Sequence, residues 1–334
     1  TPTPTTPRAP EARGTVSARS TGGQAPDAPG TEASGVVLVD KPQGWTSHDV
    51  VGRVRRLAGT RKVGHAGTLD PMATGLLVVG VNKATRLLTA ITGTDKTYTA
   101  TIRLGQSTVT DDAEGEVVQT RLANAVTPER VAEQVAALTG EILQAPSAVS
   151  AVKVAGRRAY DRVRAGEDVT LDARPVTVHE FTVHELRRLD GGRLVDLDVT
   201  VRCSSGTYIR ALARDLGEAL ETGGHLTALR RTAVGPFDVA DALSLEALAE
   251  RFAMTELSEA AAGLFPVREL TEHEAHELAF GRVVAPTGTG ETLVAGRAPD
   301  GRVIALVSDV RRRGADVAKP QLVFAPAEGP GQGR

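Results

Sequence analysis

The order of hydrophobic and polar positions between residues 35 and 237 predicts several strands. Two unbroken apolar runs, at 36–39 and 76–79, are typical of buried strands. Gly191 and Gly192 separate two alternating segments and indicate a hairpin. Alternation of apolar and polar residues predicts half-buried strands at 97–105, 175–186 and 193–203.

Helical periodicity occurs at three places between these strands. Four apolar residues from Val50 to Leu57 share one face of a helix, for which Ser47 is the candidate N-cap. Residues 128–138 and 208–220 carry the same spacing. Because strands with local hairpin signals are mixed with helices, we expect an α+β fold with a mixed, mainly antiparallel sheet flanked by helices.

Composition divides the chain into segments. Residues 1–34 are rich in Thr, Pro, Ala, Gly and Ser, so we expect a disordered tail that cannot bury enough apolar surface to fold. The main domain is expected at 35–265. A small module follows at 266–327, where an acidic helical stretch leads into short strands of the kind that form a β-barrel. A second disordered tail is expected at 328–334.

The overall composition excludes several classes of protein. Of 334 residues, 41% are hydrophobic and 24% are charged, which predicts a soluble globular protein. The sequence has no apolar run of about 18 residues, which argues against a transmembrane helix. The single cysteine, Cys203, excludes an internal disulfide and a cysteine-cluster zinc site, and it favours a reducing, cytoplasmic location.

The net charge conceals a local segregation of cations. The formal charge of −2 by itself argues against a nucleic-acid-binding protein. A polyanion responds to local charge, however, so a basic face suits such a partner, whereas solvated helix faces are the alternative interpretation. The cations gather in three groups: Arg53, Arg55, Arg56, Arg61 and Lys62; Lys153, Arg157, Arg158, Arg162 and Arg164; Arg210, Arg214, Arg230 and Arg231.

The segment 64–75 combines three glycines with a carboxylate and an imidazole. Its glycines allow sharp, closely approached backbone conformations, and Asp70 and His65 lie on the same loop. The alternative is structural, because Asp before Pro71 is typical of a helix start. No Gly-Lys-Ser/Thr follows the glycines, so a phosphate loop is excluded, and no second His stands at a zinc-ligand spacing.

Three further segments carry candidate chemistry. At 202–210 a predicted strand turns through Ser-Ser-Gly into a helix, whose start suits a phosphate and bears Tyr208 beside Arg210. Tyr98 falls within an alternating strand, and residues 226–231 end in two cations. The structural alternatives are a capped helix start for Tyr208 and a core position for Tyr98.

Taken together, these segments resemble the TruB-type tRNA pseudouridine synthases, which form pseudouridine 55 in the T-arm. The "GTLDPMATG" element at 67–75 is highly specific to that family. The segment from about Val267 resembles the small RNA-binding PUA barrel of many members. The resemblance follows the order of five segments: 38–44, 64–77, 96–105, 203–210 and 229–237.

The resemblance implies the pseudouridine synthase catalytic fold and a catalytic role for Asp70. The reaction breaks the bond from ribose C1′ to uracil N1 and rejoins C1′ to C5, so it needs no cofactor and no metal. Asp70 would act by covalent attack or as a base, and the sequence leaves both open. Arg210 would be its ionic partner. Asp112 matches a family acid whose role the resemblance does not give.

The resemblance also implies a pocket for a uridine that has been swung out of the RNA. Tyr98 would stack on the base, Tyr208 and Leu229 would line the pocket, and His65 would hold the extruded nucleotide. Lys41, in the "DKPQG" turn, would bind near the substrate in a structural or phosphate-proximal role.

The expected partner is the T-arm stem-loop of a tRNA, bound by a monomer with no membrane association. An insertion at about 145–175 falls where the family closes over the T-arm, and T-loop shape would supply specificity. Cations would contact phosphates without reading bases. The expected backbone contacts are Lys153, Arg157, Arg158, Arg162, Arg230 and Arg231.

Two other functions fit parts of the sequence. One is a tRNA-binding or remodelling protein that uses the same cleft without turnover. The other is a glycoside-type hydrolase, which needs two carboxyl groups across the scissile bond. The matched motifs offer no obvious second acid beside Asp70, so the hydrolase is the less favoured hypothesis.

Overall fold

The computed structural model describes residues 33–147, 153–154, 157–158, 172–312 and 314–324. The predicted tails at 1–34 and 328–334 therefore lie outside the described residues, except for Ala33 and Ser34. Most of the predicted insertion at 145–175 also lies outside them. Its described parts include a short hairpin of β8 (Lys153–Val154) and β9 (Arg157–Arg158).

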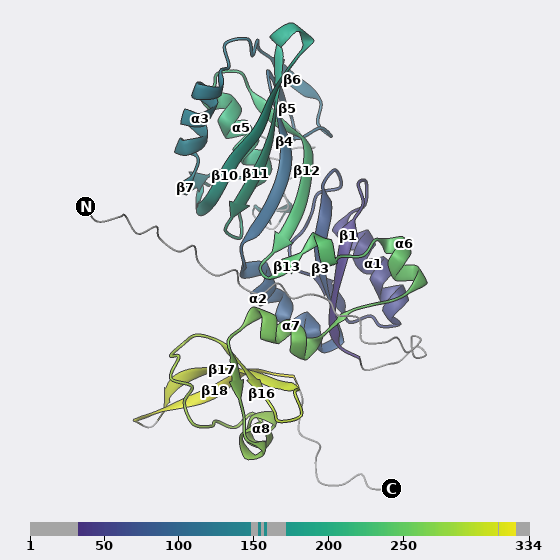
Figure 1. Ribbon diagram of the computed structural model, residues 1–334, viewed down its shortest axis with the longest axis vertical. Helices are drawn as coiled ribbons and strands as arrows, with labels where there is room; N and C mark the ends of the chain where they lie inside the picture. The colour runs from purple at the N-terminus through teal and green to yellow at the C-terminus, as the bar shows by residue number, and fades with distance from the viewer. Residues whose placement is uncertain (1–32, 148–152, 155–156, 159–171, 313, 325–334) are drawn as a thin grey trace, which may run out of the picture.

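The larger part of the molecule is built on a mixed sheet with the strand order β14-β1-β3-β12-β4-β11-β10-β7 (Figure 1). β2 adds to β3, and β13 adds to β12. Among these strands only β3 and β12 pair in parallel, joining Thr74 to Arg230 and Gly75 to Arg231. The predicted, mainly antiparallel α+β fold is confirmed. The strands are β1 (Gly35–Lys41), β2 (Val63–His65), β3 (Thr74–Val81), β4 (Lys96–Leu104), β7 (Gly140–Gln144), β10 (Arg174–Leu189), β11 (Leu194–Cys203), β12 (Gly224–Val234), β13 (Phe237–Asp238) and β14 (Thr255–Glu256).

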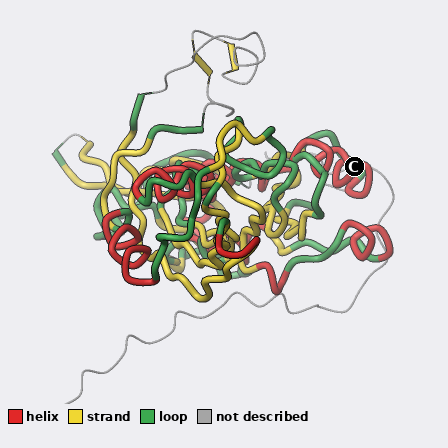
Figure 2. Tube along the Cα trace, turned by 90° about the horizontal axis from the view of Figure 1, so that it is seen from above, coloured by secondary structure: helices red, strands yellow, loops and turns green. Residues whose placement is uncertain are grey.

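Helices pack against both halves of this sheet, and in the half that contains β1 and β3 they cover both faces. In one half, α5 packs against β12 and β4, while α3 packs against β10. In the other half, α1 contacts β3 and lies beside α6, and α7 contacts β1. Figure 2 shows the helices at the periphery of the strands. The helices are α1 (Ser47–Ala58), α2 (Leu88–Gly93), α3 (Pro128–Ala137), α5 (Ile209–Ala219), α6 (Leu245–Glu250) and α7 (Leu257–Leu264).

Burial explains why the sequence patterns predict these strands. β4 buries every second residue, and Ile102 and Leu104 join a core with α5. β1 and β3 are buried on both faces: Val37 and Val39 pack toward α1, whereas Val36 packs toward α7. The alternating segments are thus half-buried strands, and the unbroken apolar runs are strands enclosed on both sides.

A second, four-stranded sheet forms the C-terminal part of the molecule. Its order is β15-β16-β17-β18, and α8 (Glu272–Ala279) packs against β17 and β18. The predicted C-terminal β module with an acidic helix is therefore present. Among the described residues, no helix has the length and apolar character needed to cross a membrane. The strands are β15 (Val267–Glu269), β16 (Val294–Arg297), β17 (Val303–Arg312) and β18 (Ala315–Val323).

The structure corrects one local expectation, excludes one alternative and reveals one strand that the sequence patterns did not predict. The N-cap of α1 is Thr46, which forms a capping box with Asp49, so Ser47 is free for another contact. No helix begins at Asp70-Pro71, which lies in a turn before β3. The segment at 226–231 is part of β12, a central strand that the apolar pattern does not reveal because it contains a buried arginine, Arg231.

A substitution of Gly75 tests whether the close approach of β3 and β12 requires a glycine. Its φ is 97°, and a Cβ there would collide with the backbone of Arg231. Gly75→Ala should therefore lower the free energy of unfolding by about 2 kcal/mol or more, measured by urea denaturation. Gly52→Ala is the control, because Gly52 lies within α1 and a Cβ there meets no atom within 4 Å. That substitution should stabilise by up to about 1 kcal/mol, and equal effects of both would contradict the steric argument.

Candidate active site

The loop between β2 and β3 carries Asp70, and one buried arginine holds its first half. The Arg231 guanidinium donates to the carbonyl of Gly67 at 3.0 Å, of Thr68 at 3.5 Å and of Leu76 at 2.8 Å. Arg231 is only 1% exposed. Because an irregular loop cannot pair its own carbonyls as a strand does, donors must come from elsewhere in the chain. Arg231 supplies them from β12.

The second half of the loop is held from the N-terminal side. The Ser47 hydroxyl accepts from Leu69 N at 2.9 Å and donates to Leu69 O at 3.1 Å. The carbonyl of Pro71 accepts from Gly44 N at 2.8 Å and from Lys41 Nζ at 3.3 Å. The backbone on both sides of Asp70 is therefore fixed by elements that are distant in sequence.

Lys41 is a structural residue. It is fully buried, and its ammonium donates to the carbonyls of Trp45 at 2.7 Å, Pro42 at 3.0 Å and Pro71. Burial lowers the pKa of Lys41 to about 8, and the nearby charge of Asp70 opposes that change. Of the two roles expected for Lys41, the structure supports the structural one. Contact with a phosphate does not fit an ammonium enclosed by three carbonyls.

Asp70 and Arg210 form an ion pair between the loop that precedes β3 and the start of α5. Arg210 Nε lies 3.0 Å from Asp70 Oδ2, and the Asp70 side chain is 36% exposed whereas that of Arg210 is buried. Arg210 is the second residue of α5, so the start of this helix aims its guanidinium at the loop. The expected pairing of Asp70 with Arg210 thus agrees with the geometry.

A second carboxylate holds the other side of the guanidinium. Arg210 Nη1 lies 3.6 Å from Asp112 Oδ2 and donates to the carbonyl of Thr110 at 2.9 Å. Asp112 is buried and also accepts from the Thr110 hydroxyl and from Glu114 N. Because two carboxylates and a carbonyl surround it, Arg210 is fixed in place while Asp70 faces outward. This geometry gives Asp112 a positioning role.

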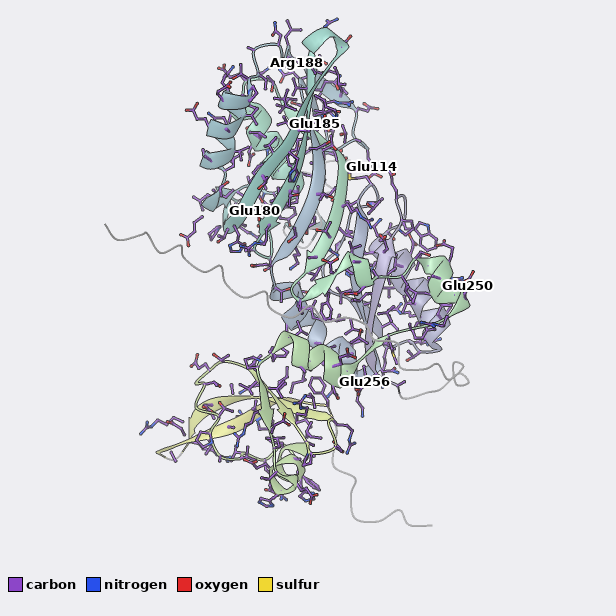
Figure 3. All side chains as sticks on the ribbon, viewed as in Figure 1. Glu114, Glu180, Glu185, Arg188, Glu250 and Glu256 are labelled. Carbon is purple, nitrogen blue, oxygen red and sulfur yellow. The ribbon has the colours of Figure 1, made fainter. Side chains whose placement is uncertain are left out.

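A third acid lies close to Asp70. Glu114 is exposed, at the side of the upper sheet in Figure 3. Partial burial raises the pKa of Glu114, and the charges of Asp112 and Asp70 add to this effect. The sequence offered no obvious second acid beside Asp70, whereas the fold brings Asp112 and Glu114 to it. Of these two acids, Asp112 is buried and paired with Arg210, whereas Glu114 is exposed.

A pocket of about 600 Å³ opens beside this ion pair and contains most of the predicted site residues. Burial raises the pKa of Tyr98 and of Tyr208, so both phenols keep their protons. Burial lowers the pKa of His65, which favours the neutral imidazole. The backbone of Tyr208 is held by the amide of Gln144, at 2.8 and 3.1 Å. The pocket lining includes His65, Asp70, Lys96, Tyr98, Tyr208, Arg210, Leu229 and Arg231.

Several cations expected at an RNA backbone lie elsewhere. The expectation for Arg231 is wrong, because its buried guanidinium is bound to loop carbonyls and cannot reach a phosphate at the surface. Arg230 instead pairs with Asp40 at 2.7 and 2.9 Å. It lines a different depression, of about 590 Å³, with threonines of β4 and β11. The side chains of Lys153, Arg157, Arg158 and Arg162 lie outside the described residues.

Sequence reasoning missed three residues of the site. Ser47 stood out only as a candidate cap, and Gln144 carried no signal in the sequence. Lys96 begins the strand that carries Tyr98 and was not singled out, but its side chain lines the pocket and its ammonium donates to Thr92 O and Thr94 O at 2.6 Å. Burial lowers the pKa of Lys96 to about 8. Within the described ranges, no group of three His, Cys, Asp or Glu side chains could hold a metal ion.

Comparisons with known proteins agree with this geometry. Family models match three successive parts of the chain. The N-terminal domain of the TruB family pseudouridylate synthases matches residues 55–209, and the C-terminal domain of tRNA pseudouridylate synthase B matches 210–285. The C-terminal model of tRNA pseudouridine synthase II matches 265–325.

Curated relatives and a solved structure extend the match over nearly the whole chain. The tRNA pseudouridine synthase B of Arthrobacter sp. (strain FB24) is 65% identical, over 90% of this chain and 99% of that protein. That of Thermobifida fusca (strain YX) is 60% identical, over 88% and 99%. The crystal structure of a Cbf5-Nop10-Gar1 complex contains a chain with a TM-score of 0.67 and 26% identity, covering 88% of this chain and 86% of that one. With the "GTLDPMATG" loop, its paired arginine and its tyrosine-lined pocket in one place, this chain belongs to the TruB family of pseudouridylate synthases.

Proposed function

We propose that this protein converts uridine 55 in the T-loop of tRNA to pseudouridine, with Asp70 as the catalytic carboxylate. The observation that carries the proposal is the Asp70–Arg210 pair at the mouth of a pocket that also contains Tyr98 and Tyr208. The reaction is an isomerisation: the C1′–N1 bond breaks, the uracil turns, and a C1′–C5 bond forms. The proton lost from C5 is balanced by one gained at N1.

Arg210 and Asp112 prepare Asp70 for this role. A guanidinium beside a carboxylate favours its charged form, which both covalent attack at C1′ and base catalysis require. Asp112 prevents Arg210 from turning away, since it engages the opposite side of the same guanidinium. Asp70 therefore presents a charged oxygen to a ribose in the pocket.

The remaining pocket residues fit an extruded uracil. Swinging a nucleotide out of a folded loop costs a few kcal/mol, and stacking on an aromatic ring recovers about 1–3 kcal/mol per base. Tyr98, which is held within β4, would supply that face, with Tyr208 and Leu229 on the other sides. The neutral His65 would contact the extruded nucleotide from the β2 side.

The proposed substrate is the T-arm of tRNA, as the names of the relatives suggest. The T-loop is a folded single strand, the kind of RNA that proteins recognise by shape and by unstacked bases. We further propose that the protein acts in the cytoplasm as a monomer.

Replacing Asp70 tests the chemistry directly. Asp70→Asn keeps the size of the side chain and removes its charge, so turnover on a T-arm stem-loop should fall by more than about a thousandfold, with RNA affinity retained. Pseudouridine is measured by release of tritium from [5-³H]uridine. Retained turnover would exclude Asp70 as the catalytic group. Release of free uracil by the unmodified protein would instead support the hydrolase.

Replacing Arg210 tests the ion pair. Arg210→Ala leaves Asp112 buried without its cation, so unfolding should require about 3 kcal/mol less free energy. Arg210→Lys keeps a charge without the fork geometry and should fold better yet remain impaired in turnover. The measurement is kcat on a T-arm stem-loop, with the free energy of unfolding from urea denaturation beside it. Full kcat in both variants would contradict a role for the ion pair in turnover.

Replacing Ser47 tests whether the loop positions Asp70. Ser47→Ala leaves Leu69 N–H and C=O without their partner, which should destabilise by about 1–3 kcal/mol. Because Asp70 is the next residue, kcat should fall while KM stays nearly constant. Ser47→Thr retains the hydroxyl and should restore most of the rate. Loss of stability without any loss of kcat would reduce Ser47 to a purely structural residue.

A further inference from the structure

A third depression lies near the proposed active site, beside α1. It has a volume of about 390 Å³. We call it the α1 groove, and it is lined by Gly44, Trp45, His48, Asp49, Gly52 and Arg56. His48, Gly52 and Arg56 recur every four residues along one side of α1, and Gly44 and Trp45 precede the helix. Neither the sequence nor the comparisons assign a function to this groove.

The α1 groove lies close to the pocket that contains Asp70. His48 lines the groove and His65 lines the pocket, and their ring centroids are 6.4 Å apart in an edge-to-face arrangement. The two histidines therefore lie between the residues that line the two depressions. An RNA strand that left the pocket on this side would pass them.

The groove is also fixed to the catalytic loop. Lys41 Nζ binds the carbonyls of Trp45 and Pro71, and Gly44 N binds the same carbonyl of Pro71. Gly44 and Trp45, which line the groove, are thus connected by hydrogen bonds to Pro71, the residue that follows Asp70, or to the Lys41 ammonium that binds it. A ligand in the groove and a nucleotide in the pocket would be held in a constant relation to each other.

The residues of the groove suit a nucleotide. Trp45 packs partly against the core beneath α1, its exposed part lines the groove, and it is the one tryptophan of the chain. Gly52 leaves the floor open, since a Cβ there would meet no atom within 4 Å. Arg56 stands at the far end with an exposed guanidinium. An aromatic ring, a small floor and a cation form the combination that binds a base together with its phosphate.

The charges around the groove favour an anion. Arg56, Arg61 and Lys62 are exposed, and none of them forms an ion pair with any residue that the structure describes. Asp49 is engaged in the capping box of α1. Arg53 differs, because it lies near Glu246 on α6, an acidic helix whose Glu250 is labelled in Figure 3. The uncompensated cations therefore gather around the end of α1 and the start of β2, which leads to His65.

We propose that the α1 groove binds a nucleotide of the RNA substrate adjacent to the extruded uridine, with its base against Trp45 and its phosphates at Arg56 and at the Arg61–Lys62 pair. The proposal rests on the proposed function, because the occupant belongs to the same RNA. It also gives the cationic group at 53–62 a role that the expected RNA contacts left unassigned.

Trp45 itself reports on the groove. The Asp70→Asn protein, which holds the RNA without converting it, is titrated with a T-arm stem-loop while its tryptophan emission is recorded. Saturable quenching is expected, with the same midpoint as binding measured by calorimetry. RNA binding that leaves the emission unchanged in intensity and wavelength would overturn the proposal.

A blocking variant separates direct contact from a remote effect on Trp45. Gly52→Gln fills the floor of the groove with an uncharged, helix-favouring side chain, so the fold should be unaffected. RNA affinity should fall about fivefold or more if a stacked base is displaced. Ala136→Gln, on the exposed face of α3, is the matched control and should leave affinity unchanged. Equal affinity of the two variants would count against the groove.

Neutralising cations tests the phosphate contacts. The double variant Arg56→Gln, Lys62→Gln should reduce the slope of log affinity against log salt by about 1.4, since each contact to a single strand contributes about 0.7. Arg121→Gln, Arg130→Gln removes two charges near α3 and should leave the slope unchanged. An unchanged slope in the first variant would overturn the proposal.

Turnover by the unmodified protein on the same RNA distinguishes the two hypotheses. Pseudouridine formed while the Trp45 emission and the salt slope stay unchanged would overturn the groove alone. Quenching of Trp45 by an RNA that is never converted would support the groove and contradict the proposed function.

Discussion

The guanidinium of Arg210 between Asp70 and Asp112 is the interaction on which the site depends. A buried cation is tolerated only when opposite charge and hydrogen-bond acceptors surround it. Here the buried Asp112, the carbonyl of Thr110 and the partly exposed Asp70 all contribute to that compensation. Asp70 therefore lines the pocket, while the buried Asp112 holds the guanidinium of Arg210 in place.

The loop that carries Asp70 shows the same use of buried cations as internal supports. Its carbonyls receive donors from β12, from the start of α1 and from the end of β1, through Arg231, Ser47 and Lys41. An irregular backbone becomes rigid when each polar group has a partner, and this rigidity fixes Asp70 without regular secondary structure. Some cations of the basic segments, such as Arg231, thus stabilise the interior, so the binding of RNA would depend on other cations.

Much of the fold could be predicted from the sequence, because burial leaves a periodic signal. Apolar runs and alternation located β1, β3, β4, β10 and β11. β12 could not be found in this way, since Arg231 interrupts the apolar pattern of a central strand and its compensation comes from carbonyls far away in sequence. Asp70, Arg210 and their pairing were expected from family resemblance, and the geometry agrees with that expectation. The contacts of Ser47, Gln144 and Asp112 are tertiary hydrogen bonds, which no local pattern encodes.

The parallel pairing of β3 with β12 has a consequence for how the molecule is made. Thr74 and Gly75 meet Arg230 and Arg231 across some two-thirds of the main domain, and Arg231 alone reaches back 155 positions to Leu76. Closing so long a stretch of chain carries an entropic penalty that local contacts cannot offset in advance. In a nascent polypeptide, the loop that carries Asp70 is therefore synthesised long before Arg231, which binds its carbonyls. The site can therefore be completed only after β12, which carries Arg230 and Arg231, has paired with β3.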